Sequence, residues 1–240
     1  MRKLAVAVAL ASTTLASPVL ARDNSWYVGV GAGVMIVEDI DLDIGTTNNA
    51  GTLDHRAGYD AEGVVGYDFG GFRAEVEVGY READIKSGTF AAPGIPTNAG
   101  GTGTFIGGTA LNGDTNALSF MVNGLLDFGD DDGLQGFVGG GVGVARVSVE
   151  PVFAGPFLDD SDTGFAWQAI AGIRAPLTRN WDVGLKYRFF NADNLDLVGQ
   201  NGDYSGRMRS HSLLGTLTYN FGGPEPTPEV APPPPPPPPP

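Results

Sequence analysis

The stretch FRAEVEVGYR, residues 72–81, decides the fold class. Its apolar and polar residues alternate strictly: Phe72, Ala74, Val76, Val78 and Tyr80 alternate with Arg73, Glu75, Glu77, Gly79 and Arg81. Successive side chains of a β-strand point to opposite faces of a sheet, so one face of this segment is apolar and the other carries four charges. A helix would scatter those charges around its circumference. The stretch therefore predicts a strand.

The same two-residue period recurs on both sides of this stretch. It is found in residues 26–34, 59–69, 118–128, 137–144, 165–175, 181–189 and 212–221. Together with 72–81 these make eight segments, each near the roughly 9–11 residues that a tilted membrane strand needs. No run of about 18 or more apolar residues is found after the N-terminal segment, so a transmembrane helix is not expected.

The connections between these segments alternate between short and long. Short ones fall at Gly70-Gly71, at residues 129–133 and at residues 178–180, whereas the long ones are centred near Asn48, Gly100, Gly155 and Gln200. This alternation is typical of a membrane barrel with short periplasmic turns and long extracellular loops. We therefore expect an all-β, eight-stranded antiparallel up-and-down transmembrane β-barrel in an outer membrane, with both chain ends periplasmic.

The aromatic residues of the apolar faces fall into two groups, which predict two girdles at the membrane interfaces. Near the short turns lie Trp26, Phe69, Phe72, Phe128, Trp181, Tyr219 and Phe221, and toward the long connections lie Tyr59, Tyr80, Phe165, Trp167, Tyr187 and Phe189. The alternative is a soluble β-sandwich with the same alternation, whose apolar faces would pack inward. A sandwich has no reason to sort its aromatic residues into two belts.

The two ends of the chain differ from the segments between them. Arg2 and Lys3, a short apolar run and Val19-Leu20-Ala21 predict a signal peptide over residues 1–21. The barrel is expected over residues 22–222. Residues 223–240 end in nine prolines and predict a stiff polyproline II linker. The net charge of −14 argues against a nucleic-acid partner, and the absence of cysteine excludes disulfides and thiolate sites.

The polar faces predict a charged barrel interior, because eight strands enclose a space just wide enough for side chains. Its charged members are Asp60, Glu62, Glu75, Glu77 and Asp182 with Arg73, Arg81, Arg174, Lys186 and Arg188. Glycines at 29, 31, 33, 139, 141 and 143 are expected to leave room for these long side chains. Two interpretations stay open: a plug of structural ion pairs, or a gated ion path through rearranging pairs.

No catalytic, cofactor or metal site is expected. Asp39-Ile-Asp41-Leu-Asp43 resembles the start of a calcium loop, but its spacing fails and its alternation predicts a strand projecting above the membrane. His211 and Ser212 are adjacent on a strand, so their side chains point to opposite faces and cannot exchange a proton directly. We therefore expect that the chain is not an enzyme, and a lipid-modifying barrel enzyme is the least favoured alternative.

Several motifs resemble the outer-membrane protein β-barrel family that includes the OmpA membrane domain and alphaproteobacterial surface antigens. They are Trp26-Tyr-Val-Gly29, Asn123-Gly-Leu-Leu-Asp-Phe128, Leu185-Lys-Tyr-Arg-Phe-Phe190, Ser210-His-Ser-Leu-Leu-Gly215 and Tyr219-Asn-Phe-Gly222. The resemblance implies that the barrel-insertion machinery recognises Tyr219 and Phe221 in the last strand. It also implies that a peptidoglycan-binding domain follows the proline-rich linker, so that contact with peptidoglycan needs a domain beyond Pro240.

The function expected from these features is structural. The barrel would contribute to envelope integrity and display its loops, conducting ions at most through a narrow pore. Its expected partners are outer-membrane lipid, lipopolysaccharide and the insertion machinery. The alternative function is that of an adhesin or surface antigen acting through the long extracellular loops.

Overall fold

The computed structural model describes residues 23–96, 104–130, 133–152, 158–199 and 202–222. The expected signal peptide and the expected linker lie outside these residues. In this part of the chain, no helix is long and apolar enough to cross a membrane.

All regular structure in the described residues is β-strand. The strands are β1 (Ser25–Val37), β2 (Ile40–Ile44), β3 (Thr47–His55), β4 (Gly58–Asp68), β5 (Phe72–Pro96), β6 (Thr104–Ala110), β7 (Asp114–Phe128), β8 (Gln135–Val149), β9 (Asp160–Pro176), β10 (Trp181–Gly199) and β11 (Gly202–Asn220).

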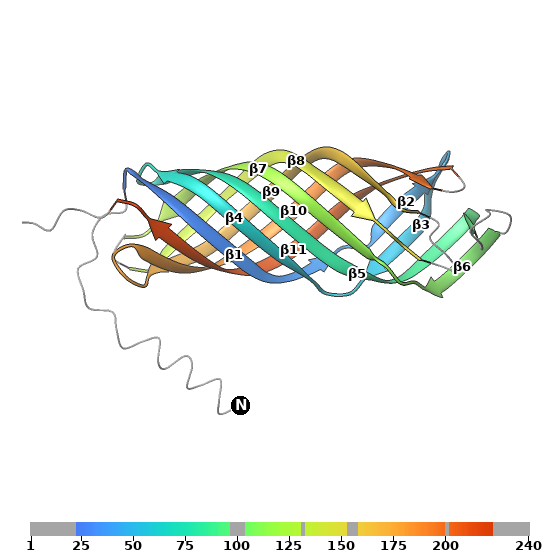
Figure 1. Cartoon of the computed structure of the whole chain (residues 1–240), viewed down its shortest axis with the longest axis horizontal. Coiled ribbons are helices and arrows are strands. Elements are labelled where there is room, and N and C mark those ends of the chain that lie inside the picture. Colours follow the sequence, from blue (N-terminus) through green and yellow to red (C-terminus); the bar gives the residue numbers. More distant parts are fainter. Residues whose placement is uncertain (1–22, 97–103, 131–132, 153–157, 200–201, 223–240) are drawn as a thin grey trace, which may run out of the picture.

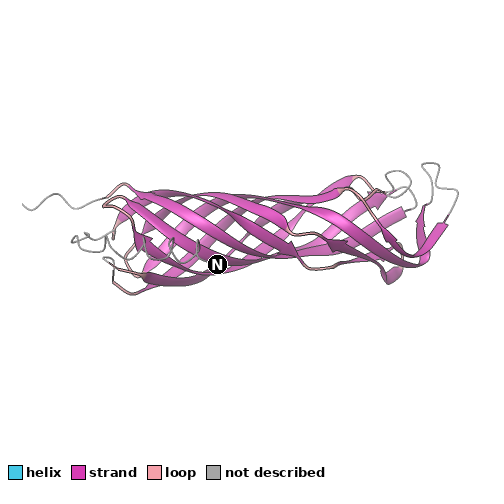
Figure 2. Ribbon diagram, turned by 90° about the horizontal axis from the view of Figure 1, so that it is seen from below, coloured by secondary structure: helices cyan, strands magenta, loops and turns pink. Residues whose placement is uncertain are grey.

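Eight of the strands close a ring in the order β1-β4-β5-β7-β8-β9-β10-β11 (Figures 1 and 2). Each pairs antiparallel with its neighbours, and β1 closes the ring by pairing with both β4 and β11. This confirms the predicted eight-stranded up-and-down barrel. The short turns leave β4, β7 and β9, and Gly70 and Gly129 adopt φ of +100° and +112° there, a backbone region that favours glycine.

The long connections differ from the expected loops, because they contain strands. β5, β10 and β11 run beyond the ring, and the β2–β3 hairpin continues the barrel wall between β11 and β5. β6 adds to the other side of β5. We call this part the extension, and it lies at the end opposite the short turns (Figure 1). β2 is the strand that the alternation around Asp41 predicts.

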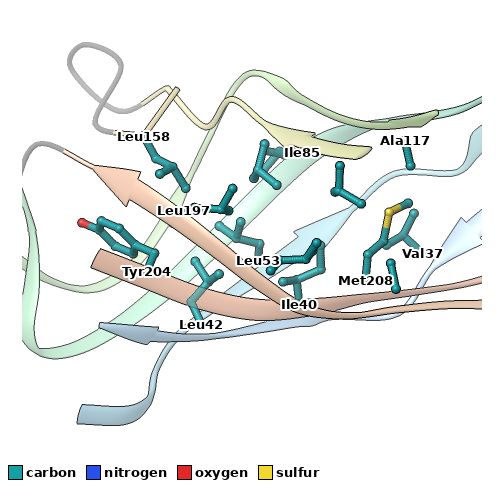
Figure 3. Close-up of a cluster of buried hydrophobic side chains, with 14 of the residues drawn as sticks. Val37, Ile40, Leu42, Leu53, Ile85, Ala117, Leu158, Leu197, Tyr204 and Met208 are labelled. Atoms are coloured by element: carbon teal, nitrogen blue, oxygen red, sulfur yellow. The ribbon is translucent and has the colours of Figure 1, made fainter. Parts of the chain in front are cut away.

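The extension and the adjoining part of the barrel enclose an apolar core. Figure 3 shows part of this cluster, in which side chains from both walls meet: Val37, Ile40, Leu42, Leu53, Ile85, Ala117, Leu158, Leu197, Tyr204 and Met208. All of these side chains are buried, with at most 5 % of their surface exposed. Burial of this apolar surface explains why the connections are strands, since their inward residues gain a core to pack into.

The outward face of the barrel below the extension is apolar. Val30, Val76 and Val122 expose 61, 58 and 60 % of their surface, whereas Glu75 and Glu77 on either side of Val76 and Asn123 next to Val122 are buried. A soluble sandwich would show the reverse. The alternation therefore belongs to a barrel with an apolar outside and a polar inside, and the sandwich alternative is wrong.

Candidate functional site

The centre of the barrel interior is organised around Arg188, which projects inward from β10. Its Nη2 lies 2.8 Å from Glu62 Oε2 and 3.2 Å from Asp60 Oδ1, and its Nη1 donates to Glu77. None of the Arg188 side-chain surface is exposed. One guanidinium therefore joins carboxylates from β4 and β5, two strands that lie across the barrel interior from β10.

Arg81 on β5 forms the boundary between the polar interior and the apolar core. Its Nε lies 3.3 Å from Asp60 Oδ2, and its Nη1 donates to Ser119 Oγ at 2.9 Å. On the other side, its guanidinium lies 3.8 Å from the centre of the Phe190 ring. In such a cation–π contact the face of the aromatic ring attracts the cation, so the guanidinium keeps a favourable electrostatic interaction on its apolar side.

A second group of ion pairs lies near the short turns. Arg73 donates twice to Asp127, at 2.8 and 2.9 Å, in the bidentate geometry that suits arginine and carboxylate. Arg174 lies 3.1 Å from Asp68 and 3.4 Å from Asp127, and it donates to Gln135 at 2.7 Å. These contacts join β4, β5, β7 and β9 across the interior.

The remaining three predicted interior charges are also buried. Lys186 Nζ lies 2.5 Å from Glu62 Oε1. Glu75 accepts a hydrogen bond from the Tyr27 hydroxyl at 2.8 Å and lies 3.6 Å from Arg73 Nη1. Asp182 accepts from the Asn220 amide at 2.9 Å. The structure thus brings all ten predicted residues into one lumen.

Two carboxylates and several neutral groups complete this network and were not among the predicted members. Asp68 and Asp127 are the missed acids, and their signal was available because both alternate with apolar residues in segments 59–69 and 118–128. Among the neutral groups, Gln168 donates to Glu77 at 3.0 Å and to Asn123 at 2.7 Å. Neutral polar residues on an inward face give no charge signal in a sequence.

The described interior leaves little free space. Between the two groups of ion pairs there is a cavity of about 20 Å³, bordered by residues that include Arg73, Glu75 and Lys186. This volume is enough for about one water molecule. Above Arg81 the apolar core follows directly. Along the described interior, the two groups of ion pairs and the apolar core thus follow one another.

The predicted girdle residues lie on the outward face, and all but Phe189 and Tyr219 are at least 38 % exposed. Phe189 is half-buried against Trp167, with ring centres 5.3 Å apart. Near the end of β11, Tyr219 is half-buried and lies between Trp181 and Phe221, at ring-centre distances of 5.0 and 5.1 Å. Recognition of Tyr219 and Phe221 by insertion machinery stays a prediction.

His211 takes part in an outward polar cluster near the extension. Its Nε2 lies 2.9 Å from Glu38 Oε1 and its Nδ1 lies 2.8 Å from the Tyr187 hydroxyl. Arg209 binds the other oxygen of Glu38 at 3.0 Å. Ser212 is 2 % exposed and faces the interior. The ring therefore has an acidic partner, but the neighbouring serine is on the opposite face, as expected.

Within the described ranges, no three His, Cys, Asp or Glu side chains are placed to hold a metal ion. This includes Asp41 and Asp43, whose carboxylates accept hydrogen bonds from Thr52 and from the backbone of Asn49.

Comparison with known proteins agrees with this architecture. A family model described as outer membrane protein beta-barrel domain matches residues 7–221. A Rickettsia canadensis protein named as a candidate adhesin is 24 % identical over 234 residues, covering 92 % of this chain and 100 % of the relative. The outer membrane protein PagN of Salmonella typhimurium is 28 % identical over 165 residues, covering 62 % of this chain and 65 % of PagN.

Two solved structures share the fold. Neisserial surface protein A has a TM-score of 0.51 at 16 % identity, covering 82 % of this chain and 97 % of that protein. OprG from Pseudomonas aeruginosa has a TM-score of 0.53 at 11 % identity, covering 83 % of this chain and 96 % of OprG. At these identities the likeness shows the fold alone.

Proposed function

The chain belongs to the outer membrane protein beta-barrel domain family, and on this premise we propose that it is a closed structural barrel that holds a rigid, acidic extension outside the cell. The observation that carries this proposal is the contrast between the two parts. The barrel interior is filled by ion pairs and an apolar core, whereas the long connections form an ordered extension.

The proposed orientation places the short turns in the periplasm and the extension outside. It follows the pattern of bacterial membrane barrels, in which the periplasmic turns are short and the extracellular connections are long. The chain contains no cysteine, so single cysteines can test it. Asn48→Cys in the extension should react with a membrane-impermeant maleimide on intact cells, whereas Gly71→Cys in a short turn should react only after permeabilisation. The opposite pattern would reverse the orientation.

The filled interior favours a structural role in the envelope and argues against a pore. An ion entering from the short turns would have to displace Arg73 from Asp127 and then pass the apolar core, where an unpaired charge is strongly disfavoured. We expect no stepwise conductance when the full chain is reconstituted in planar bilayers. The closed barrel would be contradicted by steady channels that persist after repurification and whose conductance changes in the variant Leu53→Arg, which alters the core.

An adhesive role is the second candidate, and the names of several relatives favour it. The acidity of the extension gives such a role a physical basis. The described residues of the extension and of the adjoining ends of the ring strands, taken as 38–56, 82–96, 104–116, 146–152, 158–163, 191–199 and 202–209, contain 15 Asp and Glu side chains but 5 Arg and Lys side chains. A surface of this charge attracts cationic partners and repels anionic ones.

Cell binding can separate the two candidates. Cells that display the full chain should bind a host-cell monolayer more than cells that display a variant with residues 40–55 replaced by a short Gly-Ser linker, at equal surface amounts. If the protein acts only in envelope integrity, both cell types should bind the monolayer equally. Deletion of the gene should then lower detergent resistance, and the full chain and the variant should restore it equally.

A further inference from the structure

The extension has an open sheet edge at β6, which lies at its margin (Figure 1). β6 pairs with β5 on one side, and in the described part of the chain no strand pairs with its other side. Leu111, which follows β6, donates its N–H to the carbonyl of Lys86 on β5 at 3.2 Å. Successive residues of an antiparallel strand direct their backbone groups alternately toward and away from the partner strand. The N–H groups of Ala110 and Gly108 therefore point away from β5.

The next residue along the chain confirms this alternation and shows that the outer side can pair. Asn112 donates its N–H to the Val152 carbonyl at 3.3 Å, and Val152 donates to the Asn112 carbonyl at 2.8 Å. Ala110 and Gly108 come next along the same side, and both are exposed. Among the described residues, their N–H groups have no hydrogen-bond partner. A strand added there would continue the ladder that the Asn112–Val152 bridge begins.

β6 also lacks the features by which edge strands avoid pairing. Its sequence, TFIGGTA, has no charged residue and no proline, and Ile106 is 59 % exposed. Charged residues and proline are common devices that keep an exposed edge from joining another chain. The opposite edge of the extension, at β10, differs because Asp160 and Asp162 accept hydrogen bonds from its backbone N–H groups. In the described extension, one edge is thus closed by side chains and the other is open.

Three carboxylates lie beside the end of β6 that is nearer the barrel, and we call them the acidic corner: Asp84, Asp114 and Glu150. Asp84 pairs with Asp114 across β5 and β7, and Glu150 donates its N–H to the Asp114 carbonyl at 3.0 Å. Asp84 and Glu150 are exposed, and Asp114 is half-buried. The lysine nearest to them in sequence, Lys86, is paired with Asp54. The corner therefore attracts a chain with Lys or Arg, whereas the acidic extension repels a second copy of itself.

We propose that the open edge of β6 binds an extended segment of a cationic partner polypeptide, which pairs antiparallel with β6 and places Lys or Arg at the acidic corner. This inference deepens the adhesive role and rests on the orientation proposed above, which puts the edge outside the cell. In such strand addition, backbone hydrogen bonds provide affinity and side chains provide specificity. Because Val152 occupies the position beside Asn112, the partner begins beside Ala110 and runs toward Thr104. Its basic residues therefore belong at its N-terminal end.

Peptide binding to the full chain in nanodiscs can test the site. The probe is a fluorescent peptide of alternating Thr and Val with two lysines at its N-terminal end, and its binding is followed by fluorescence anisotropy. Ala110→Pro removes one outward N–H, and proline is tolerated on an edge strand where that N–H faces solvent. We expect about tenfold weaker binding, the contribution of one hydrogen bond. Ala110→Ser keeps the N–H and is the matched control, which should bind as tightly as wild type.

A second peptide, in which glutamate replaces both lysines, tests the role of charge and should bind more weakly than the first. Equal binding of the two peptides would overturn the cationic partner, and equal binding of the lysine peptide to wild type and Ala110→Pro would overturn the edge site.

Hydrogen exchange of the Gly108 and Ala110 amides gives an independent readout on the same protein. Both amides should exchange rapidly in the free protein and slowly with the lysine peptide. Slow exchange without peptide would contradict the open edge. It would assign the edge to a second copy if protection rises with protein concentration, and to the chain itself if it does not. Orientation is measured by cysteine labelling and adhesion by the hairpin replacement, so failure of the edge site can be distinguished from failure of either.

Discussion

At the residue scale, the barrel interior contains more acidic than basic side chains. Seven buried carboxylates share the described lumen with five basic groups: Asp60, Glu62, Asp68, Glu75, Glu77, Asp127 and Asp182 with Arg73, Arg81, Arg174, Lys186 and Arg188. Neutral donors meet the surplus of acceptors, since Tyr27 binds Glu75, Asn123 binds Glu77 and Asn220 binds Asp182. Buried polar groups need such partners whether or not they are charged.

Arg188→Ala should destabilise the barrel by about 3–5 kcal/mol, because it leaves buried carboxylates without their shared partner. The measurement is the free energy of unfolding by urea in lipid vesicles. Lys86→Ala is the control, since Lys86 and Asp54 pair in the extension with side chains 57 % and 39 % exposed. Such solvated pairs contribute little. Similar losses in both variants would show that the Arg188 pairs have no special role.

Two of the interior glycines serve different purposes. At Gly31 an added Cβ would lie 2.8 Å from Glu62 Oε1, so this glycine leaves room for a long charged side chain of the lumen, as the sequence predicts. At Gly33 an added Cβ would lie 1.9 Å from the Leu213 carbonyl oxygen, which is backbone. There the glycine permits close approach of two strands, a reason that only the pairing of β1 with β11 reveals.

At the element scale, single strands serve two environments. The lower part of β5 has apolar residues outside and charges inside, whereas its upper part places Ile85 and Phe90 in the apolar core. The inward face thus changes from polar to apolar along one strand without a break in pairing. β10 and β11 change in the same way, with Arg188 and Ser212 below and Leu197 and Tyr204 above.

Val76→Arg should destabilise the barrel by about 2–4 kcal/mol, because it places a charge on the lipid-facing wall near mid-bilayer. Thr163→Arg is the control, since Thr163 is exposed on β9 close to the extension. Both are compared by reversible unfolding in the same vesicles. If Val76→Arg proves no more destabilising than Thr163→Arg, the outward face of β5 does not meet lipid.

The upper edge of β10 is protected by carboxylates in place of a neighbouring strand. Asp160 and Asp162 accept hydrogen bonds from the backbone N–H groups of Val198 and Asp196, at 2.8 and 3.0 Å. These bonds satisfy donors that would otherwise form an open sheet edge, a site at which other chains can pair.

The bond to Asp160 should depend on pH. The N–H groups of Val198 and Ser161 hold the pKa of Asp160 below its ordinary value. Because the folded pKa is lowered, the stabilisation is fully present above the unfolded value of about 3.9 and is lost as the pH falls through the lower folded pKa. Hydrogen exchange of the Val198 amide should therefore accelerate only in strong acid, after correction for intrinsic rates. Asp160→Asn should remove this pH dependence. If the exchange profile is unchanged in that variant, the pH dependence arises from a group other than Asp160.

At the scale of the whole molecule, a closed ring and an open extension share strands. The ring of eight closes without help from the extension, whereas the extension depends on β5, β10 and β11 of the ring. The interior is correspondingly divided into an ion-paired part and an apolar part that meet at Arg81. We therefore expect the barrel to act as a rigid support and the extension to tolerate replacement of its residues.

Replacement of residues 40–55 by a short linker should leave the ring intact, because β1 still pairs with β4 and β11. The variant should keep heat-modifiable gel mobility and antiparallel β circular dichroism. It should lose protection from hydrogen exchange over residues 202–208, whose neighbours Ile40, Leu42 and Leu53 are gone. Failure of the ring to form would show that the β2–β3 hairpin is needed for closure.

The sequence by itself determined the strands of the ring and their number, their inward and outward faces and the identity of most lumen charges. These depend on a two-residue period, which is a local property of each segment and can be read along FRAEVEVGYR or any of its counterparts. The short turns were also legible, because glycine pairs and polar clusters mark them locally.

Only the tertiary structure decided which groups meet. Arg188 and Glu77 lie 111 residues apart in sequence, as do His211 and Glu38 at a separation of 173, and no local pattern encodes such pairs. The extension was underestimated for the same reason. β3 and β6 become strands only when β5 offers them a partner and the core offers a surface on which Leu53 of β3 and Phe105 of β6 can pack. Strand pairing is a relation between distant segments, and its energy is gained only after the chain has closed on itself.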